Sequence, residues 1–337
     1  MKISLNWLTD YVDVAAVGVG ELAEMFTRIG LCCEGVIETD ADVVFDLEVT
    51  SNRPDCLGYI GVAREAAAAL QLELKLPDLS AVPTASPPAA ELTDVQVLAP
   101  ELCPRYTARV IRGVKVGPSP RWLIDRLEAV GLRGVNNVVD ATNYVLLECS
   151  QPLHAFDLDL LAERRIVVRR GLPGETIVSI DGARCELTDQ VCVIADAEKA
   201  VAIGGIMGGL ESEINEKTVN ILIESARFDP LATRKAARAM SLMTESSYRF
   251  ERGVDPVGVD SASLRACGLI LQLGGGELAE GVATSSPTDD FIEQFFYDDD
   301  DKYGRLHYTI DFEGRYTEYE YDTFGRVEIK YYYADST

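Results

Sequence analysis

Residues 136–157 constrain the fold more than any other segment, because polar side chains are dense there among apolar neighbours. Two polar halves, 136–144 and 151–157, flank the apolar run 144–147, and the second half contains His154, the first histidine of the chain. Buried polar groups need hydrogen-bond partners, and a polar ligand is one such partner. The alternative is a helix boundary at which Asn and Asp side chains only cap backbone groups. The local pattern by itself favours this alternative.

A glycine cluster follows the strand-like run 191–194. Residues 204–209 contain four glycines in six positions, and glycine permits both positive φ and a close approach of the backbone to a ligand. The cluster is not a P-loop, because no Gly-Lys-Ser/Thr follows it, and its spacing does not fit a dinucleotide-binding fingerprint. Glu224 then ends a second apolar run, 219–223. These features shift the interpretation of residues 136–157 toward a ligand site.

Four motifs occur in the same order in the beta chain of bacterial phenylalanyl-tRNA synthetase, and the chain resembles that family. They are Asn-Asn-Val-Val-Asp-x-Thr-Asn-Tyr (136–144), Gln-Pro-Leu-His-Ala-Phe-Asp (151–157), Gly-x-Met-Gly-Gly (205–209) and Thr-Glu-x-Ser-Tyr-Arg-Phe-Glu-Arg-Gly-Val-Asp-Pro (244–256). The resemblance runs from Met1 to about Thr284. It implies that this region is similar to the family's editing module (B3/B4), which hydrolyses tyrosine wrongly attached to phenylalanine tRNA.

The resemblance implies a role for each of eight residues. The catalytic groups would be His154, Thr142 and Asn143, and the substrate-binding groups would be Glu224, Gly205, Thr244, Ser246 and Arg133. Ser246 departs from the family, which usually has alanine there. His154 is expected to position the hydrolytic water, while Thr142 and Asn143 hold the ester carbonyl or the terminal ribose. Arg133 is expected to meet a phosphate or that ribose.

Discrimination of tyrosine from phenylalanine depends on one hydroxyl group. An apolar synthetic pocket rejects an extra hydroxyl only about a hundredfold, so a second, hydrolytic site is the expected remedy. In that site a buried Glu224 carboxylate would accept a hydrogen bond from the phenol. Phenylalanine would leave the carboxylate unpaired, at a cost of about 1–3 kcal/mol or more in binding free energy. Gly205 would let the ring approach the backbone. Two alternatives stay open: Glu224 as a strand-end carboxylate in a salt bridge, and His154 as a core histidine bonded to Asp157 or to a backbone carbonyl.

Cofactors and partners follow from the same resemblance. No Ser-His-Asp or Cys-His set and no metal-ligand spacing is evident in the sequence, so direct hydrolysis without a covalent intermediate or a metal is expected. ATP and Mg²⁺ are expected only for the complete synthetase. One expected partner is the 3′ end of tRNA(Phe) carrying tyrosine. A synthetase alpha subunit is a second, if the interface for it, which is missing from this chain, is supplied. DNA and membranes are not expected as partners. The alternative function is a non-catalytic remnant that binds tRNA or a partner.

The expected fold class is α+β, because strands and helices mix without regular βαβ alternation. Four parts are expected: a small N-terminal α/β module (1–75), a proline-rich linker (76–92), a B3/B4-like editing domain (93–284) and a hairpin-like tail (285–337). Family members usually carry an oligonucleotide-binding barrel after a segment like residues 34–36. Only residues 37–42 are available for it here, so we expect that tRNA-binding domain, like the family's C-terminal modules, to be absent.

Apolar periodicity predicts the elements of the two larger parts. Helices are expected at residues 20–29, 57–70, 118–130, 231–240 and 260–273. Strands are expected at residues 43–49, 95–97, 106–111, 166–168 and 176–180, with a hairpin turn at Asp181 and Gly182.

Charge and cysteine content limit the surroundings of the chain. The net charge is −24, of which residues 288–337 contribute −9 from 14 acidic and 5 basic residues. Such a surface repels polyphosphate, so any tRNA contact must be local or rely on a partner's basic surface. None of the eight cysteines forms a Cys-x-x-Cys pair, and the first residues lack the apolar core of a signal peptide. A cytoplasmic protein is therefore expected.

The tail from about residue 288 does not resemble the synthetase family. It contains nine of the 14 tyrosines and repeats Gly-Arg at 304–305, 314–315 and 325–326. This pattern resembles one or two YD-type (RHS) hairpin repeats, and no chemistry is assigned to it.

Overall fold

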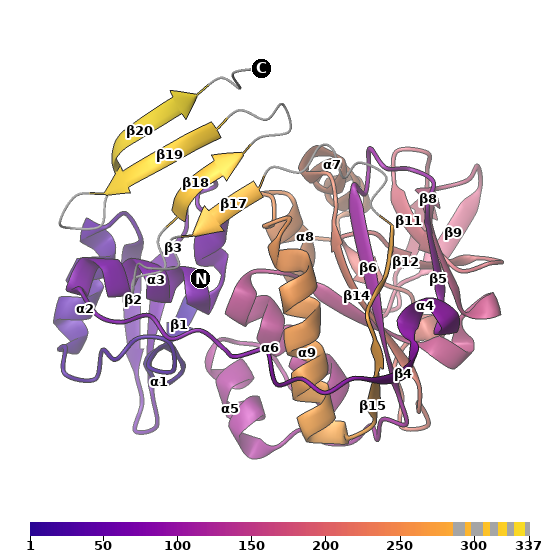
Figure 1. Ribbon diagram of the computed structural model, residues 1–337, viewed down its shortest axis with the longest axis horizontal. Helices are drawn as coiled ribbons and strands as arrows, with labels where there is room; N and C mark the ends of the chain where they lie inside the picture. Colours follow the sequence, from indigo (N-terminus) through magenta and orange to yellow (C-terminus); the bar gives the residue numbers. More distant parts are fainter. Residues whose placement is uncertain (286–293, 298–305, 311–315, 322–326, 334–337) are drawn as a thin grey trace.

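The computed structural model describes residues 1–285 and, beyond them, the backbone of four strands at 294–297, 306–310, 316–321 and 327–333 (Figure 1). Helices are mixed with sheets that contain both parallel and antiparallel strand pairs, which confirms the expected α+β class. Within these residues, no helix is both long and apolar enough to cross a membrane.

The N-terminal module is a three-stranded antiparallel sheet with helices packed on it. Its elements are β1 (Lys2–Ser4), α1 (Leu5–Leu8), α2 (Val19–Arg28), β2 (Cys32–Glu38), β3 (Val43–Glu48), the 3-10 helix η1 (Pro54–Leu57) and α3 (Tyr59–Leu70). β3 is the central strand. Residues 39–42 join β2 to β3 as a hairpin loop, which leaves no room for a barrel between them. α2 buries Leu22, Met25 and Phe26, the apolar side that its spacing predicts.

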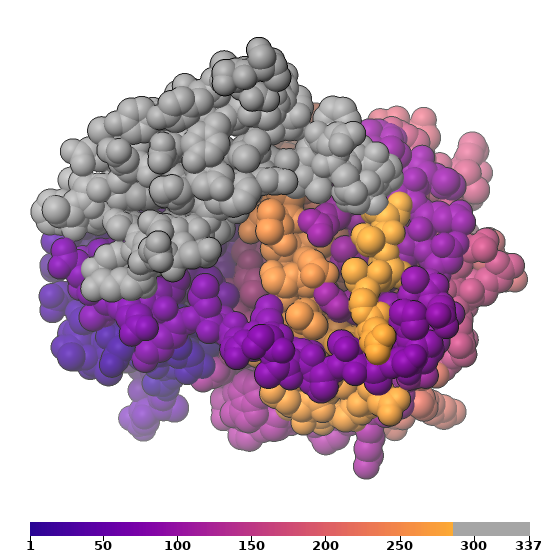
Figure 2. Space-filling view, viewed as in Figure 1, coloured from indigo at the N-terminus to yellow at the C-terminus, as the bar shows by residue number. Residues whose placement is uncertain are grey.

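The linker is more structured than the extended chain expected from its composition. β4 (Ala85–Pro88) pairs in parallel with β15 (Glu277–Glu280), and α4 (Ala89–Leu92) forms one helical turn. Before β4, Val82 lies against Gly268, where an added Cβ would come within 3.1 Å of the valine side chain. Gly268 belongs to α9 (Gly258–Gly274). The linker, purple in Figure 2, therefore crosses α9 and packs against it.

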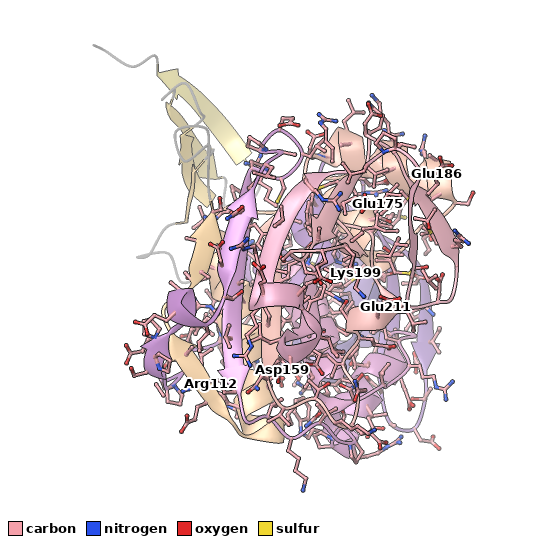
Figure 3. All side chains as sticks on the ribbon, turned by 90° about the vertical axis from the view of Figure 1, so that its right-hand side faces the viewer. Arg112, Asp159, Glu175, Glu186, Lys199 and Glu211 are labelled. Carbon is pink, nitrogen blue, oxygen red and sulfur yellow. The ribbon has the colours of Figure 1, made fainter. Side chains whose placement is uncertain are left out.

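Two sheets form the centre of the molecule. One has the strand order β4-β15-β6-β14-β7, with β16 also paired to β6, and the other has the order β13-β12-β11-β8-β5. Their remaining strands are β5 (Asp94–Val97), β6 (Arg105–Arg112), β7 (Leu153–Asp157), β8 (Arg165–Arg170), β11 (Cys192–Ala195), β12 (Ala200–Ile203), β13 (Met207–Gly208), β14 (Ile221–Arg227) and β16 (Ala283–Ser285). β9 (Glu175–Val178) and β10 (Arg184–Leu187) form a separate hairpin that turns at the predicted Asp181 and Gly182. Figure 3 faces this hairpin, which carries Glu175 and Glu186.

The sheet containing β14 has two different neighbours. Ile221 and Ile223 of β14 share one apolar cluster with α6 (Asn137–Cys149) and α9, whereas Leu222 and Ala226 belong to the cluster shared with the five-stranded sheet. Alternate residues of a strand point to opposite faces, so helices cover one face and the second sheet covers the other. The helix-side cluster also includes the N-terminal module, whose Trp7 stacks on a tyrosine of α6.

Several predicted boundaries shift. α5 (Arg121–Ala129) begins three residues later than expected, because Pro120 before it is extended (φ −66°, ψ 153°). β14 continues to Arg227, so Glu224 lies within the strand. The expectation that Glu224 ends this strand is therefore wrong. α7 (Pro230–Met240) and α9 lie close to their predicted ranges.

The tail forms a four-stranded antiparallel sheet of its own. Its strands, in order, are β17 (Gln294–Tyr297), β18 (Leu306–Ile310), β19 (Tyr316–Tyr321) and β20 (Val327–Tyr333). The hairpin character expected for the tail is therefore present in its backbone. The three Gly-Arg repeats lie outside the described residues.

Candidate editing pocket

A small pocket of about 50 Å³ lies between the two central sheets and α8 (Glu245–Phe250). It is smaller than the roughly 300–1,000 Å³ typical of small-molecule sites. Four of the eight predicted site residues line it, namely His154, Gly205, Glu224 and Ser246. The rest of its wall comes mainly from β12, the glycine cluster and Phe250 of α8. Segments far apart in the sequence thus converge on one cavity.

His154 and Glu224 face each other directly across two strands. β7 and β14 are antiparallel neighbours, and the register places His154 opposite Glu224. Cβ atoms of such cross-strand partners are about 4.5–5.5 Å apart. His154 is two residues from Phe156 on β7, and Glu224 is two residues from Leu222 on β14, so each points to the same face as that neighbour. Phe156 and Leu222 pack toward the five-stranded sheet. The strand pairing therefore fixes an imidazole and a carboxylate side by side on one pocket wall.

Glu224 is buried and has a tyrosine partner within the protein. The residue is 8% exposed, and its Oε2 accepts a hydrogen bond of 2.7 Å from the Tyr106 hydroxyl. Burial raises the pKa of Glu224 to about 7, while the bond from Tyr106 acts in the lowering direction. This partner is a phenol and not the cation of the salt bridge considered as an alternative. A carboxyl group poised near neutrality inside a pocket is a common feature of functional sites.

His154 is held between the pocket and the glycine cluster. Its Nε2 is buried without a hydrogen-bond partner, and burial lowers the pKa of His154 to about 4. The imidazole is therefore neutral at physiological pH and can orient a water through a hydrogen bond. Asp157 is bonded to Thr218 and to a backbone N–H, not to the histidine, so this alternative partner is not observed.

Glycine at 208 and 205 is required by the space around each residue. A Cβ on Gly208 would lie 2.4 Å from Cε1 of His154. Gly205 has a φ of +72°, and a Cβ there would press on Phe228 at 3.0 Å. Gly208 thus lets the backbone of β13 approach the imidazole, as the composition of the cluster suggested.

Thr244 is beside the pocket but does not line it. It caps α8, accepting from the N–H of Ser247, and its hydroxyl donates to the carbonyl of Ile206, a pocket residue, at 2.9 Å. Ser246 follows within the first turn of α8 and is half-buried. The cap therefore fixes the start of α8 against the glycine cluster, and Ser246 faces the pocket as a result.

Thr142, Asn143 and Arg133 do not line the pocket. The first two belong to α6, which packs on the opposite face of the sheet from His154 and Glu224. The Thr142 hydroxyl donates to the carbonyl of Val139 in the same helix at 2.7 Å. Arg133 is exposed in the loop between α5 and α6. Their roles toward the tRNA end stay predictions.

Much of the 136–157 segment stabilises local structure, which is what the alternative interpretation of capping side chains predicts. Asn136 caps α6 by accepting from the N–H groups of Val138 and Val139. Asn137 and Asp140 tie the helix to residues 115–119 and to the N–H of Val135. The polar motif is therefore divided: its first half holds α6, and its second half brings His154 into the pocket.

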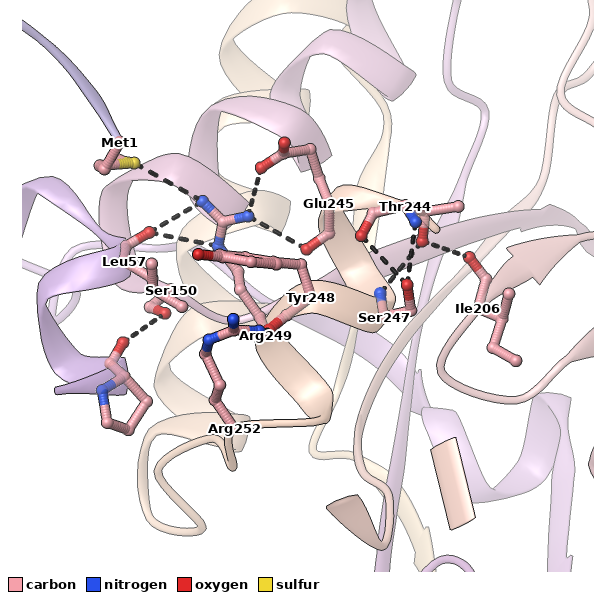
Figure 4. A network of polar contacts seen from close by, with 11 residues as sticks. Met1, Leu57, Ser150, Ile206, Thr244, Glu245, Ser247, Tyr248, Arg249 and Arg252 are labelled. Atoms are coloured by element: carbon pink, nitrogen blue, oxygen red, sulfur yellow. Dashed lines mark hydrogen bonds and ion pairs between the residues drawn. The ribbon is translucent and has the colours of Figure 1, made fainter. Parts of the chain in front are cut away.

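The long motif that begins at Thr244 also joins the two domains (Figure 4). Arg249 is 1% exposed and donates from Nε and Nη2 to the carbonyl of Leu57 in the N-terminal module, at 3.2 and 2.8 Å. Its Nη1 pairs with Glu245 at 2.6 Å. We had not predicted this role, although a buried arginine within an apolar helix pattern is a signal for one.

Glu148 makes a second link between the domains. It is fully buried in α6 and accepts from the Tyr11 hydroxyl at 2.6 Å and from Arg265 at 2.8 Å. Among residues 1–285 no group of three or more His, Cys, Asp or Glu side chains has the arrangement of a metal site.

Comparison with known proteins identifies the chain's relatives. The family model described as the B3/4 domain matches residues 102–275. The phenylalanine–tRNA ligase beta subunit of Rhodopirellula baltica is 52% identical over 287 residues, covering 85% of this chain and 42% of the relative. That of Geobacter sulfurreducens is 51% identical over 247 residues, covering 73% of this chain and 31% of the relative. This chain thus spans less than half the length of either relative.

A crystal structure is also among the proteins that this chain matches. It is an N-terminal fragment of the phenylalanyl-tRNA synthetase beta subunit from Pyrococcus horikoshii, with 15% identity and a TM-score of 0.42 over 88% of this chain and 81% of that chain. The family model alone covers more than half of the 337 residues. The chain belongs to the B3/4 domain family, in the form that occurs in phenylalanine–tRNA ligase beta subunits.

Proposed function

We propose that this chain hydrolyses the ester bond of tyrosine wrongly attached to tRNA(Phe), as the editing part of a phenylalanine–tRNA ligase beta chain. The observation that supports it best is the pair formed by His154 and Glu224, opposite each other in one pocket with Gly205 and Ser246. Glu224 is the group that distinguishes the substrates, because a buried carboxylate gains a hydrogen bond from a phenol and none from phenylalanine.

His154 is the group that acts on water in this proposal. Its neutral imidazole has an unpartnered Nε2, which can accept a hydrogen bond from a water molecule and direct the water's oxygen at the ester carbonyl. The water oxygen bonds to the carbonyl carbon, the bond from that carbon to the ribose oxygen breaks, and a proton from the water passes to the ribose oxygen, so that free tyrosine and the ribose hydroxyl are released. No covalent enzyme intermediate is formed. Thr142, Asn143 and Arg133 would contact the terminal ribose or a phosphate outside the pocket.

The proposal extends to partners and cofactors. The chain would bind the tRNA 3′ end weakly, since its net charge is −24, and tighter binding would come from a synthetase alpha subunit. The deacylation itself would need neither ATP nor Mg²⁺. A non-catalytic remnant that binds tRNA or a partner is the second candidate, favoured by the absence of Thr142 and Asn143 from the pocket wall.

The test is a deacylation assay with purified protein. Tyr-tRNA(Phe) and Phe-tRNA(Phe) are incubated with the wild-type chain, with Glu224→Ala and with His154→Ala, and a thermal melt accompanies each variant. The expected result is preferential hydrolysis of Tyr-tRNA(Phe), lost in both variants while their melting stays cooperative. Absence of hydrolysis by the wild-type chain, alone and with a cognate alpha subunit, would support the remnant.

A further inference from the structure

Tyr106 contacts Glu224 but lies outside the four sequence motifs that predicted the site. It lies in β6, next to β14, opposite Ala226 and thus on the same face of the sheet as Glu224. The ring is fully buried, and its hydroxyl is 2.7 Å from Oε2 of Glu224. A buried tyrosine hydroxyl usually has a polar partner. Here the partner is the carboxylate to which we assign recognition of a second phenol.

The other titratable groups that face Glu224 come from two strands and one loop. His154 on β7 is its cross-strand partner, Cys192 lies on β11, and Cys103 precedes β6. Burial lowers the pKa of His154 to about 4 and raises the pKa of both thiols above their usual range. All three are therefore uncharged at neutral pH. Since none of them supplies a positive charge, the Tyr106 hydroxyl is the group that favours the ionised form of Glu224.

We propose that Tyr106 is a positioning residue for specificity: its hydroxyl holds Oε2 of Glu224 so that Oε1 is presented to the hydroxyl of the substrate's tyrosine. This rests on the proposed function. A carboxylate has about four lone-pair sites, so it can accept from two phenols at once. One of these phenols is built into the protein, and the other arrives with the substrate. Phenylalanine would leave Oε1 unpaired inside the pocket.

The bond from Tyr106 has two consequences for recognition. It fixes the plane of the carboxylate before the substrate binds. A glutamate side chain without this bond would lose rotational freedom when the substrate binds, and that loss would weaken binding. It also opposes the effect of burial on the pKa of Glu224. Without the bond, Glu224 would be protonated to a higher pH and would no longer be an acceptor at both oxygens.

The test is Tyr106→Phe, which removes one oxygen and keeps the ring. Infrared spectroscopy over a pH series follows the carboxylic acid band that Glu224→Gln removes. We expect this band to persist to higher pH in Tyr106→Phe than in the wild type. We also expect hydrolysis of Tyr-tRNA(Phe) to fall about tenfold, the equivalent of one pKa unit, to recover as the pH is raised, and to be unchanged for Phe-tRNA(Phe).

Two further variants separate this effect from a general loss of structure. Tyr59→Phe is the matched control, because Tyr59 is fully buried and its hydroxyl bonds to the N–H of Ser4, remote from the pocket. It should leave the infrared band and the selectivity unchanged. Replacement of Tyr106 by 3-fluorotyrosine, a stronger donor of similar size, should shift the band toward lower pH, and it serves if Tyr106→Phe does not fold.

The possible failures can be told apart. An infrared band that does not move in either Tyr106 variant, or an unchanged preference for Tyr-tRNA(Phe) in Tyr106→Phe, would refute the role of Tyr106. If the wild-type chain hydrolyses neither substrate but the band shifts as expected, the proposed function fails while the coupling of Tyr106 to Glu224 stands. An equal loss of activity toward both substrates without recovery at higher pH would indicate a purely structural contribution and would also refute the proposal.

Discussion

Replacement of Glu224 by glutamine should make the protein more stable, and the gain should grow with pH. Burial raises the pKa of Glu224 from 4.5 to about 7. A group whose pKa is raised on folding stabilises the folded state below its unfolded pKa, and this contribution is lost as the pH rises through the folded pKa. With about 1.4 kcal/mol per pKa unit, the wild type should lose about 2–3 kcal/mol relative to Glu224→Gln between about pH 5 and pH 8. Glutamine keeps the size and can still accept from Tyr106.

The measurement is urea unfolding of both proteins at the two pH values. Because His154 titrates in both, its contribution cancels in the difference between their free energies of unfolding. Glu186→Gln on the exposed side of β10 (Figure 3) controls for the loss of one negative charge. If the difference between wild type and Glu224→Gln were the same at both pH values, the burial argument for Glu224 would be wrong, and so would its role as a poised acceptor.

Three other perturbations have defined outcomes. Gly208→Ala should displace the His154 ring, cost about 1–3 kcal/mol in a urea titration and abolish deacylation, whereas Gly117→Ala, with nothing within 4 Å of its added Cβ, should do neither. Arg249→Ala should lower the free energy of unfolding by about 1–3 kcal/mol, since a buried carbonyl of η1 loses its donor; unchanged stability would mean that this link does not hold the domains together. A chain ending at Pro287 should melt cooperatively and hydrolyse Tyr-tRNA(Phe) at least as fast as the full chain, because the sheet β17–β20 shares no described strand pair with the rest. Loss of activity at an unchanged melting temperature would mean that the tail is part of the site.

The sequence by itself determined the elements whose patterns are local. The apolar spacing of α2, the alternating residues of β6 and the Asp181–Gly182 turn predicted structures that the fold contains. Such patterns follow from the geometry of one helix or strand, so no distant contact is needed to recognise them. The motifs likewise identified the family, which the comparisons confirm.

The tertiary structure decided which polar residues share the pocket. His154 and Thr142 are close in sequence, but the strand pairing turns one toward the five-stranded sheet and the helix leaves the other on the opposite face. Tyr106 is 118 residues from Glu224 along the chain, and its role depends on β6 lying beside β14. Strand order and facing side are long-range properties, because they depend on which surfaces the whole chain can bury together. For that reason the sequence indicated a site, and only the fold showed which side chains compose it.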